Sequence, residues 1–202
     1  MISEEFLVKF CHDSCKLEGN TLSMQECTLL LKDGLTPNAK KLREIFEQIN
    51  TKKAFEYIEK KTKSDLNETL VKDIHEILME NIEQGGIYRS ESVKITGSEW
   101  IPPCGDNMLN RVKIYFNDLK ERNFEDIFEK ASYAHCEFVK IHPFRDGNGR
   151  TARMILNYIL MQNNILPVSI SPEIRVKYYE ALEKYDFTND LNDFKNLLKE
   201  EY

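Results

Sequence analysis

The sequence is poor in cysteine, glycine, proline and tryptophan, and it contains no long apolar run. Its 202 residues include 5 cysteines, 8 glycines, 6 prolines and 1 tryptophan. Nowhere do about eighteen apolar residues follow one another, which argues against a membrane-spanning helix. The first residues, MISEEFLVKF, carry acidic side chains where a secretory signal peptide needs positive charge. We therefore expect a soluble, cytoplasmic protein with no membrane partner.

A basic surface is missing as well. The chain has 28 Lys and Arg residues against 34 Asp and Glu residues, a formal net charge of −6, and the acidic residues are spread along its length. A dedicated nucleic-acid-binding protein needs a basic face to neutralise phosphates, so we expect no nucleic-acid partner. The cysteines are odd in number and form no CxxC pair. This pattern is typical of reduced thiols that are buried as small hydrophobic side chains.

Helical periodicity dominates what is present. Hydrophobic residues make up 41% of the chain, enough for a single domain with a real core. A capping box that begins at Ser23 and a glycine at Gly34 mark the two ends of one helix. The strand signal is ESVKITGSEWI, in which Val93 and Ile95 alternate with polar residues before a Gly-Ser turn. The predicted fold class is all-α, mainly helical, with one small β-hairpin.

The stretch HPFRDGNGRTAR, residues 142–153, interrupts the helical pattern and is the main candidate site. Gly147 and Gly149 let the backbone approach a ligand closely, and the free N–H groups of the following helix attract anions. Arg150 and Arg153 are three residues apart, hence on one helix face, and their guanidinium groups suit phosphate oxygens. The pattern predicts a phosphate-binding loop.

Two further side chains of this stretch predict chemistry on the bound phosphate. Asp146 offers hard oxygen ligands that can hold Mg2+ against phosphates. His142 titrates near neutrality and can take a proton from an attacking hydroxyl. An EF-hand and a P-loop are excluded, because the glycine, glutamate and GKS or GKT residues that they need are absent. A metal triad of His135, His142 and Asp146 is less favoured, since His135 lies on an apolar helix that suits a core histidine.

The same stretch resembles the Fic-domain signature HxFx(D/E)GNGRxxR and matches each of its fixed positions. The matching residues are His142, Phe144, Asp146, Gly147, Asn148, Gly149, Arg150 and Arg153. The segments NYIL after it and GIYRSESVKITGS before it are similar to the core helix pair and the flap hairpin of Fic domains. The resemblance implies a single Fic domain over residues 1–202. Its parts are an N-terminal helix at about 3–19, a core at about 64–165 and C-terminal helices at about 171–200.

The resemblance implies an enzyme, a protein adenylyltransferase that transfers AMP from ATP, with Mg2+, to a Tyr, Ser or Thr hydroxyl of a target protein. In it His142 is the general base, Asp146 binds Mg2+, and Phe144 anchors the loop in the core. Arg153 holds the γ-phosphate. The α- and β-phosphates are held by Gly147, Asn148, Gly149 and Arg150.

The signature leaves several functions open. A lysine in place of the second loop glycine would indicate a phosphotransferase similar to the death-on-curing toxins, and Gly149 argues against it. Relatives that transfer UMP or phosphocholine, or that remove AMP, are compatible with the same motif. A nucleotide-sensing interaction module is the weaker alternative, because a pure binder has no need of His142. Self-modification and homo-oligomerisation also remain open.

The segment SCKLEGN near the N-terminus matches a second Fic pattern, the (S/T)xxxE(G/N) inhibitory helix. Ser14 and Glu18 are four residues apart and share a helix face, and Gly19 with Asn20 ends that helix. The resemblance implies that Glu18 pairs with Arg153 and takes the place of the γ-phosphate, so that the enzyme is autoinhibited by a helix of its own chain.

The predicted hairpin resembles the flap that positions targets in Fic proteins. Its residues are Val93, Lys94, Ile95, Thr96 and Gly97. We expect a target segment to pair with it as an added strand, because main-chain hydrogen bonds demand little of the target's sequence. This arrangement brings a target hydroxyl near His142.

Overall fold

Two helices, α6 (Ile127–Ile141) and α7 (Asn148–Gln162), form the centre of the structure. α6 begins where Asp126 Oδ1 accepts the Glu129 N–H at 2.7 Å. α7 begins after Gly147, whose backbone is left-handed, with φ of 72°. Most residues of both helices are buried, as expected of helices that are packed on all sides. The short loop between them is therefore held by two rigid elements.

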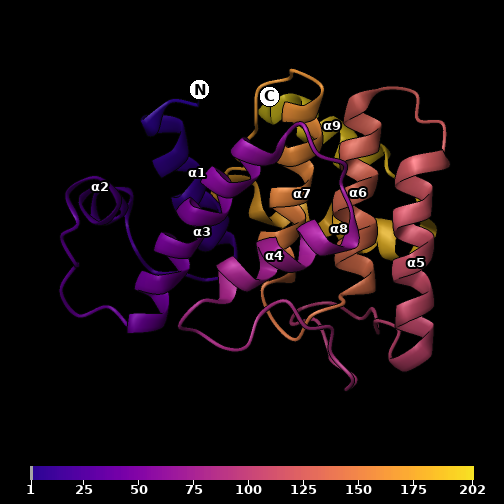
Figure 1. Cartoon of the computed structure of the whole chain (residues 1–202), viewed down its shortest axis with the longest axis horizontal. Coiled ribbons are helices and arrows are strands. Elements are labelled where there is room, and N and C mark those ends of the chain that lie inside the picture. The colour runs from indigo at the N-terminus through magenta and orange to yellow at the C-terminus, as the bar shows by residue number, and fades with distance from the viewer. Residues whose placement is uncertain (1) are drawn as a thin grey trace.

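The other helices of residues 2–202, the range that the computed structural model describes, pack around this pair (Figure 1). They are α1 (Glu4–Leu17), α2 (Met24–Asp33), α3 (Leu42–Lys61), α4 (Glu68–Met79), α5 (Gly105–Glu121), the short 3-10 turn η1 (Pro172–Ile174), α8 (Arg175–Thr188) and α9 (Asn192–Glu201). Helices α1, α3 and α4 pack against α7, whereas α5, α8 and α9 pack against α6. Helix α2 packs on α1 and α3.

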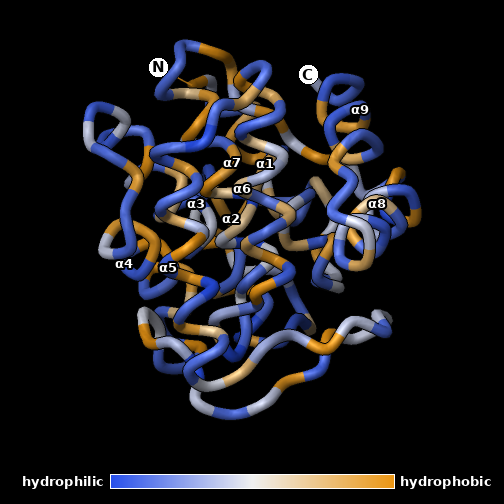
Figure 2. Tube along the Cα trace, turned by 90° about the vertical axis from the view of Figure 1, so that its right-hand side faces the viewer, coloured by the Kyte–Doolittle hydropathy of each residue, from blue (hydrophilic) through white to orange (hydrophobic). Residues whose placement is uncertain are grey.

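Apolar side chains fill the space on both sides of the central pair. Phe144, Tyr178 and Phe194 belong to the larger core, and Phe10 and Phe55 belong to a second core between α1, α3, α4 and α7. Along the helices in Figure 2, apolar residues alternate with polar ones, as in amphipathic helices. Within residues 2–202, no helix is both long and apolar enough to cross a membrane.

The cysteines follow the sequence-based expectation with one exception. All five are free, and four are buried. Cys104 is exposed, because it precedes the first turn of α5 at the surface.

The β-hairpin that the sequence predicted is wrong: the structure contains no strand between residues 2 and 202. Val93 to Gly97 lie in an irregular stretch, the connecting segment (residues 80–104), which passes below α6 and α7 in Figure 1. The alternation of Val93 and Ile95 was misleading because a returning strand needs N–H donors, and Pro102 and Pro103 have none. The all-α part of the prediction agrees with the structure.

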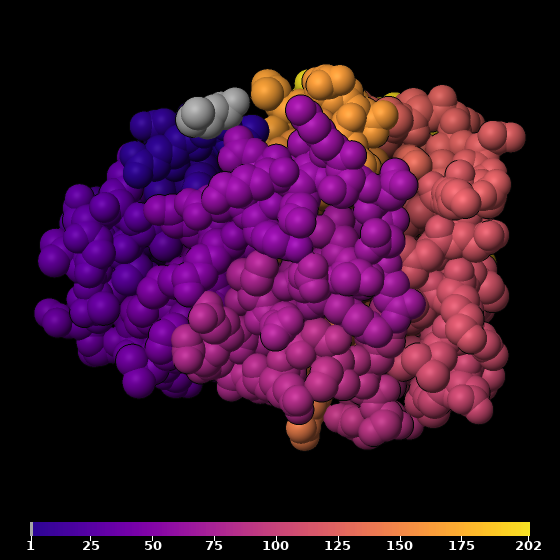
Figure 3. All heavy atoms as spheres, in the orientation of Figure 1, coloured from indigo at the N-terminus to yellow at the C-terminus, as the bar shows by residue number. Residues whose placement is uncertain are grey.

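Side chains hold the connecting segment in place of strand pairing. Arg89 Nη2 donates to Pro103 O at 2.6 Å, and Trp100 Nε1 donates to Lys140 O at 3.0 Å. Figure 3 shows that α4 and this segment cover much of one face of the molecule, with part of the loop between α6 and α7 protruding beneath them. The segment thereby forms a wall beside that loop, but it offers no hairpin edge for an added strand.

Candidate active site

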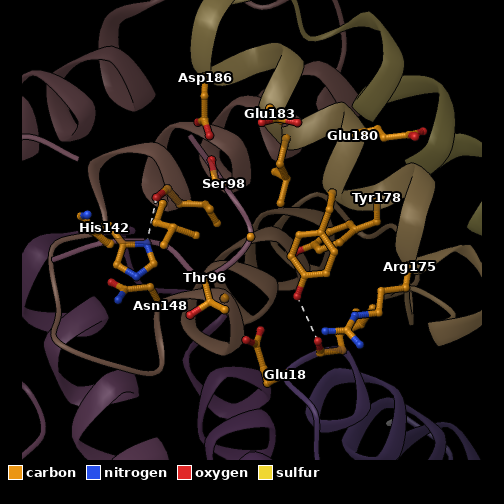
Figure 4. A pocket seen from close by; sticks show the side chains of 18 of the residues that line it. Glu18, Thr96, Ser98, His142, Asn148, Arg175, Tyr178, Glu180, Glu183 and Asp186 are labelled. Carbon is orange, nitrogen blue, oxygen red and sulfur yellow. Dashed lines mark hydrogen bonds between the residues drawn. The ribbon is translucent and has the colours of Figure 1, made fainter. Parts of the chain in front are cut away.

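A cavity of about 880 Å³ lies where the loop between α6 and α7 meets the end of α1, the connecting segment and α8. This volume suits a small-molecule site. Figure 4 shows Glu18, Thr96, His142 and Asn148 gathered at one side of the cavity, and Glu183 with Asp186 on α8 at the other. The sequence-predicted residues that line it are Glu18, Lys94, Ile95, Thr96, Gly97, His142, Asp146, Gly147, Asn148 and Gly149.

His142 is the C-terminal cap of α6 and has a left-handed backbone, with φ of 52°. Arg89 Nε donates to the His142 carbonyl oxygen at 2.7 Å and stabilises this conformation. Ring Nδ1 lies 3.2 Å from Val139 O. Because a carbonyl oxygen only accepts, Nδ1 carries the proton and Nε2 keeps a free lone pair. Burial lowers the pKa of His142 although Val139 opposes the shift, so the ring is a neutral base near pH 7.

Phe144 anchors the loop through its fully buried ring. This ring stacks on His75, with centroids 3.6 Å apart and planes 7° apart. Asn148 closes the loop, since its Oδ1 accepts the Phe144 N–H at 2.9 Å and its Nδ2 donates to Phe144 O at 2.8 Å. One N–H of the Asn148 amide stays available for an anion in the cavity.

The N-terminus of α7 presents backbone N–H groups to the cavity. Gly147, Asn148 and Gly149 line it, and the N–H groups of the first turn have no partner within the helix. A Cβ on Gly147 would come within 2.9 Å of Met79 Sδ, and a Cβ on Gly149 would overlap the Glu18 carboxylate. Glycine is therefore favoured at position 147, where φ is also positive, and it is required at position 149 while Glu18 is in place. Such a helix terminus attracts phosphate.

Asp146 lies at the edge of the cavity as a half-exposed carboxylate. It forms an ion pair with Arg43, in the first turn of α3. Its Oδ1 also accepts the Gly147 N–H at 2.6 Å. Burial opposes ionisation, but Arg150, the Gly147 N–H and Arg43 together lower the pKa of Asp146 below its usual value. The carboxylate is therefore ionised near neutral pH.

Residues 2–202 contain no group of three His, Cys, Asp or Glu side chains that could hold a metal ion. The triad of His135, His142 and Asp146 is accordingly not formed. His135 is instead a core residue, with Nε2 2.8 Å from the Tyr178 hydroxyl and its ring stacked on Phe194.

The two motif arginines lie beneath the cavity wall and differ in their contacts. Arg150 is 1% exposed, with Nη1 3.9 Å from Glu47 Oε1 and Nη2 3.9 Å from Asp146 Oδ1. Among the described residues, its Nε and Nη1 have no hydrogen-bond partner. The sequence suggested that Arg150 contacts a phosphate, but Arg150 does not line the cavity. It acts on Asp146 through its charge.

Arg153 is held by α1 and α8. Nε donates to Ser14 Oγ at 2.8 Å, Nη1 donates to the Tyr178 hydroxyl at 3.2 Å, and Nη2 donates to Glu18 Oε1 at 2.7 Å. Burial opposes the charge, but Tyr178 and Glu18 raise the pKa of Arg153. The pair expected between Glu18 and Arg153 is therefore present, and Ser14 reinforces it.

Gly19 and Asn20 shape the end of α1 and do not line the cavity. Gly19 has φ of 95°, and its N–H donates to Lys16 O at 3.0 Å. Asn20 Nδ2 donates to Glu47 Oε2 at 2.9 Å on α3. These contacts fix Glu18 at the helix terminus. Val93 is the one predicted flap residue that does not line the cavity.

Some site residues were not predicted from the sequence. Arg43, His75, Arg89 and Asp186 each contact or face the site from a separate element. His75 could have been found from the sequence. It is a histidine on the apolar face of α4, followed closely by Gly85-Gly86, and this pattern suits a buried side chain that bonds to nearby backbone. The contacts of the other three depend on the tertiary fold, which spacing in the sequence does not reveal.

Comparison with known proteins shows which proteins this chain is similar to in sequence and in fold. Residues 65–160 match the model of the Fic/DOC family. The chain is 28% identical over 189 residues to "Protein adenylyltransferase fic-1" of Caenorhabditis elegans and 29% identical over 188 residues to "Protein adenylyltransferase Fic" of Aedes aegypti. These matches cover 90% and 89% of this chain but 37% of each relative, so the chain spans little more than a third of their length.

Solved structures are similar as well. Fic-1 (aa134 - 508) from C. elegans superposes with a TM-score of 0.88 at 26% identity, over 100% of this chain and 61% of that one. A Fic-domain-containing signalling protein from Bacteroides thetaiotaomicron gives a TM-score of 0.85 at 25% identity, over 97% of this chain and 82% of that one. Motif, fold and relatives agree: residues 65–160 match the Fic/DOC family, and the chain as a whole is similar to Fic-domain proteins.

Proposed function

We propose that this chain is a protein adenylyltransferase that transfers AMP from Mg-ATP to a Tyr, Ser or Thr hydroxyl of a target protein. One observation carries the proposal: the base His142, the N-terminus of α7 and the carboxylate of Asp146 all face one cavity. The names of the relatives from C. elegans and Aedes aegypti support it. The whole of residues 1–202 is proposed to act as one Fic domain.

His142 performs the proton chemistry. Because Nδ1 is held by Val139 O, Nε2 accepts the proton of the incoming hydroxyl as the hydroxyl oxygen bonds to the α-phosphorus. The bond from the α-phosphorus to the oxygen that bridges to the β-phosphate breaks, and pyrophosphate leaves. The N–H groups at the start of α7 stabilise the negative charge on the phosphoryl oxygens.

Asp146 fits the role of Mg2+ ligand. Proteins usually hold Mg2+ through one or two carboxylates together with substrate phosphates and waters, rather than by an all-protein cage. Asp146 is such a carboxylate, ionised and beside the anion-binding N-terminus of α7. Asp146 would hold the ion in place of its ion pair with Arg43, and the ion would supply positive charge against the phosphates.

We propose that α1 inhibits the enzyme through Glu18. Its carboxylate accepts the hydrogen bond from Arg153 that the γ-phosphate needs. The same carboxylate lies against Gly149, where the phosphates bind. A charge-assisted hydrogen bond of this kind contributes roughly 1.5–3 kcal/mol. This free energy keeps most molecules inactive until a partner displaces α1.

The connecting segment is the proposed docking place for the target. Lys94, Ile95, Thr96 and Gly97 line the cavity, and all but Ile95 are exposed. A target segment that lies along them brings its hydroxyl to His142 without strand pairing. The free cysteines suit a reducing compartment, the cytoplasm.

Removal of AMP is a second candidate activity. The Glu18 side chain is 34% exposed, and Oε1 is the oxygen that binds Arg153. Its other oxygen can orient a water for attack on an AMP-modified target.

The proposed function is tested with ATP labelled on the α-phosphate. Glu18→Gly should transfer AMP, to a protein target or to itself, at least tenfold faster than the parent. This increase corresponds to an activation free energy that is lower by about 1.4 kcal/mol. The double variant Glu18→Gly/His142→Ala is the matched control and should form no adduct. Reversible nucleotide binding without any adduct in Glu18→Gly would indicate a sensing module. Equal rates for the parent and Glu18→Gly would exclude Glu18 as the inhibitor.

A further inference from the structure

The side of the cavity opposite the loop carries an acidic residue that the proposed reaction does not use. Asp186, on α8, is 4% exposed, and it lines the cavity beside Glu183 (Figure 4). Among residues 2–202, no side chain or backbone group forms a hydrogen bond or ion pair with its carboxylate. A buried carboxylate without a partner is costly, so we expect a ligand group to supply the partner.

The surroundings of Asp186 favour its neutral form. The charged and titratable groups that act on it are Glu137, Lys140 and Cys136 on α6 and Glu183 on α8. Arg111 on α5 lies 3.9 Å from Glu137, and Lys94 of the connecting segment lines the same cavity. Lys140 Nζ is held by Asn189 Oδ1 at 2.8 Å and lies over the Trp100 ring. Burial raises the pKa of Asp186 to about 7; Lys140 opposes this shift, and Glu137 and Glu183 add to it.

The cavity leaves room for a nucleoside next to Asp186. If the triphosphate binds at the N-terminus of α7, as proposed above, the nucleoside would lie in the remaining cavity between the connecting segment and α8. Val139, Leu182 and Ile95 line the cavity with apolar side chains that suit the faces of a base. Asp186 is then available for a polar edge of the base. Figure 4 shows the Ser98 hydroxyl directed toward Asp186.

We propose that Asp186 selects the base of the bound nucleotide, pairing with adenine when it is protonated and with guanine when it is ionised. Adenine presents an acceptor, N1, beside a donor, the N6 amino group, and a carboxylic acid matches both with its O–H and its C=O. Guanine presents two neighbouring donors, N1–H and the N2 amino group, which match the two oxygens of a carboxylate. The inference rests on the proposed function only for the placement of the triphosphate.

The test measures kcat/KM for ATP and for GTP in the Glu18→Gly background between pH 6 and pH 8. With its pKa near 7, Asp186 is about nine-tenths protonated at pH 6 and about nine-tenths ionised at pH 8. The ratio of kcat/KM for ATP to kcat/KM for GTP should fall at least tenfold from pH 6 to pH 8, because a mismatched edge of the base leaves buried polar groups unpaired. Titration of His142 affects both nucleotides alike and cancels in the ratio.

Two variants separate Asp186 from its neighbour. Asp186→Asn keeps one donor and one acceptor at every pH, so its ratio should stay in favour of ATP and should not change with pH. Glu183→Gln removes the adjacent carboxylate and should keep the pH dependence. A constant ratio in the Glu18→Gly background, or a pH-dependent ratio in Asp186→Asn, would overturn the inference.

Binding distinguishes failure of this inference from failure of the proposed function. Calorimetry with non-hydrolysable ATP and GTP analogues, on the Glu18→Gly/His142→Ala variant, measures base preference without transfer. A preference that changes with pH while no variant transfers AMP supports base selection by Asp186 and rejects the adenylyltransferase. Transfer with a pH-independent preference rejects base selection alone.

Discussion

The two ring nitrogens of His142 have different surroundings, and this difference determines what the residue can do. Nδ1 is 3.2 Å from the Val139 carbonyl, and the ring lines the cavity. Since the hydrogen bond fixes the tautomer, removal of the ring should affect the proposed proton transfer and leave the proposed phosphate contacts of α7 unchanged.

We predict that His142→Ala, in the Glu18→Gly background, lowers AMP transfer by about 10²-fold or more. Its Kd for a non-hydrolysable ATP analogue should stay within about threefold of the background, because the imidazole does not bind the triphosphate. Label transfer and calorimetry measure the two quantities. His12→Ala, a change on α1 away from the cavity, serves as the control. Transfer at the background rate by His142→Ala would remove His142 from the mechanism.

Most of the residues that line the cavity beside the loop were among those predicted from the sequence. His142, Asp146 and the loop glycines lie within one short motif, and the structure brings them to one cavity. The orientation of Arg150 could not be predicted, because periodicity places residues on a helix face without showing which neighbour, here Glu47, they meet. The raised pKa of Asp186 likewise depends on burial against α6, a long-range contact.

At the scale of elements, α4 connects two parts of the site through His75. The Gly86 N–H donates to its Nδ1 at 2.9 Å, so Nε2 carries the proton and donates to Asp146 O at 2.9 Å. One side chain thus links the start of the connecting segment to the backbone of the proposed metal ligand. It is a positioning residue, and its two hydrogen bonds can be removed separately.

We predict that His75→Asn and His75→Gln differ in their Mg2+ requirement. Both lose the ring that stacks on Phe144. Asn keeps an acceptor near Nδ1 but no donor to Asp146, whereas Gln keeps a donor near Nε2. In the Glu18→Gly background, His75→Asn should raise the Mg2+ concentration for half-maximal transfer by about tenfold, as outer-shell changes commonly do, and His75→Gln by much less. Equal Mg2+ requirements for the two variants would assign His75 a purely structural role.

Helix ends were easier to predict than the connecting segment. The capping box of α2 is formed, with Ser23 Oγ and the Glu26 carboxylate bonded to the backbone, because these contacts are local in sequence. A strand pattern needs a distant partner. Val93 and Ile95 are half-buried in alternation as expected, yet no strand pairs with them in the described chain.

At the scale of the whole molecule, Asp186 affects how stability depends on pH. Its pKa is about 7 in the folded protein against a usual value of 3.8, so the folded state binds more protons than the unfolded state between these values. The stability that this group contributes is therefore full at low pH, falls as pH rises between these two values, and is lost above about pH 7.

We predict that Asp186→Asn raises the melting temperature at pH 8 by several degrees, since about 1 kcal/mol corresponds to about 2–4 °C in a domain of this size. The difference from the parent should shrink steadily toward pH 4, where the carboxyl is neutral in both states. Thermal unfolding across this range is the measurement, with Glu183→Gln as the control. A difference that does not vary with pH would contradict the raised pKa.

Under the proposed function, the contact of Glu18 with Arg153 couples the position of the N-terminal helix to nucleotide binding, and this coupling is reciprocal. If a partner that binds α1 away from Arg153 tightens ATP by some factor, ATP must tighten that partner by the same factor. The two ligands then behave as a coincidence detector, because each raises the occupancy of the other. The concentration of ATP in the cell would thus help to decide whether the activating partner is recruited at all.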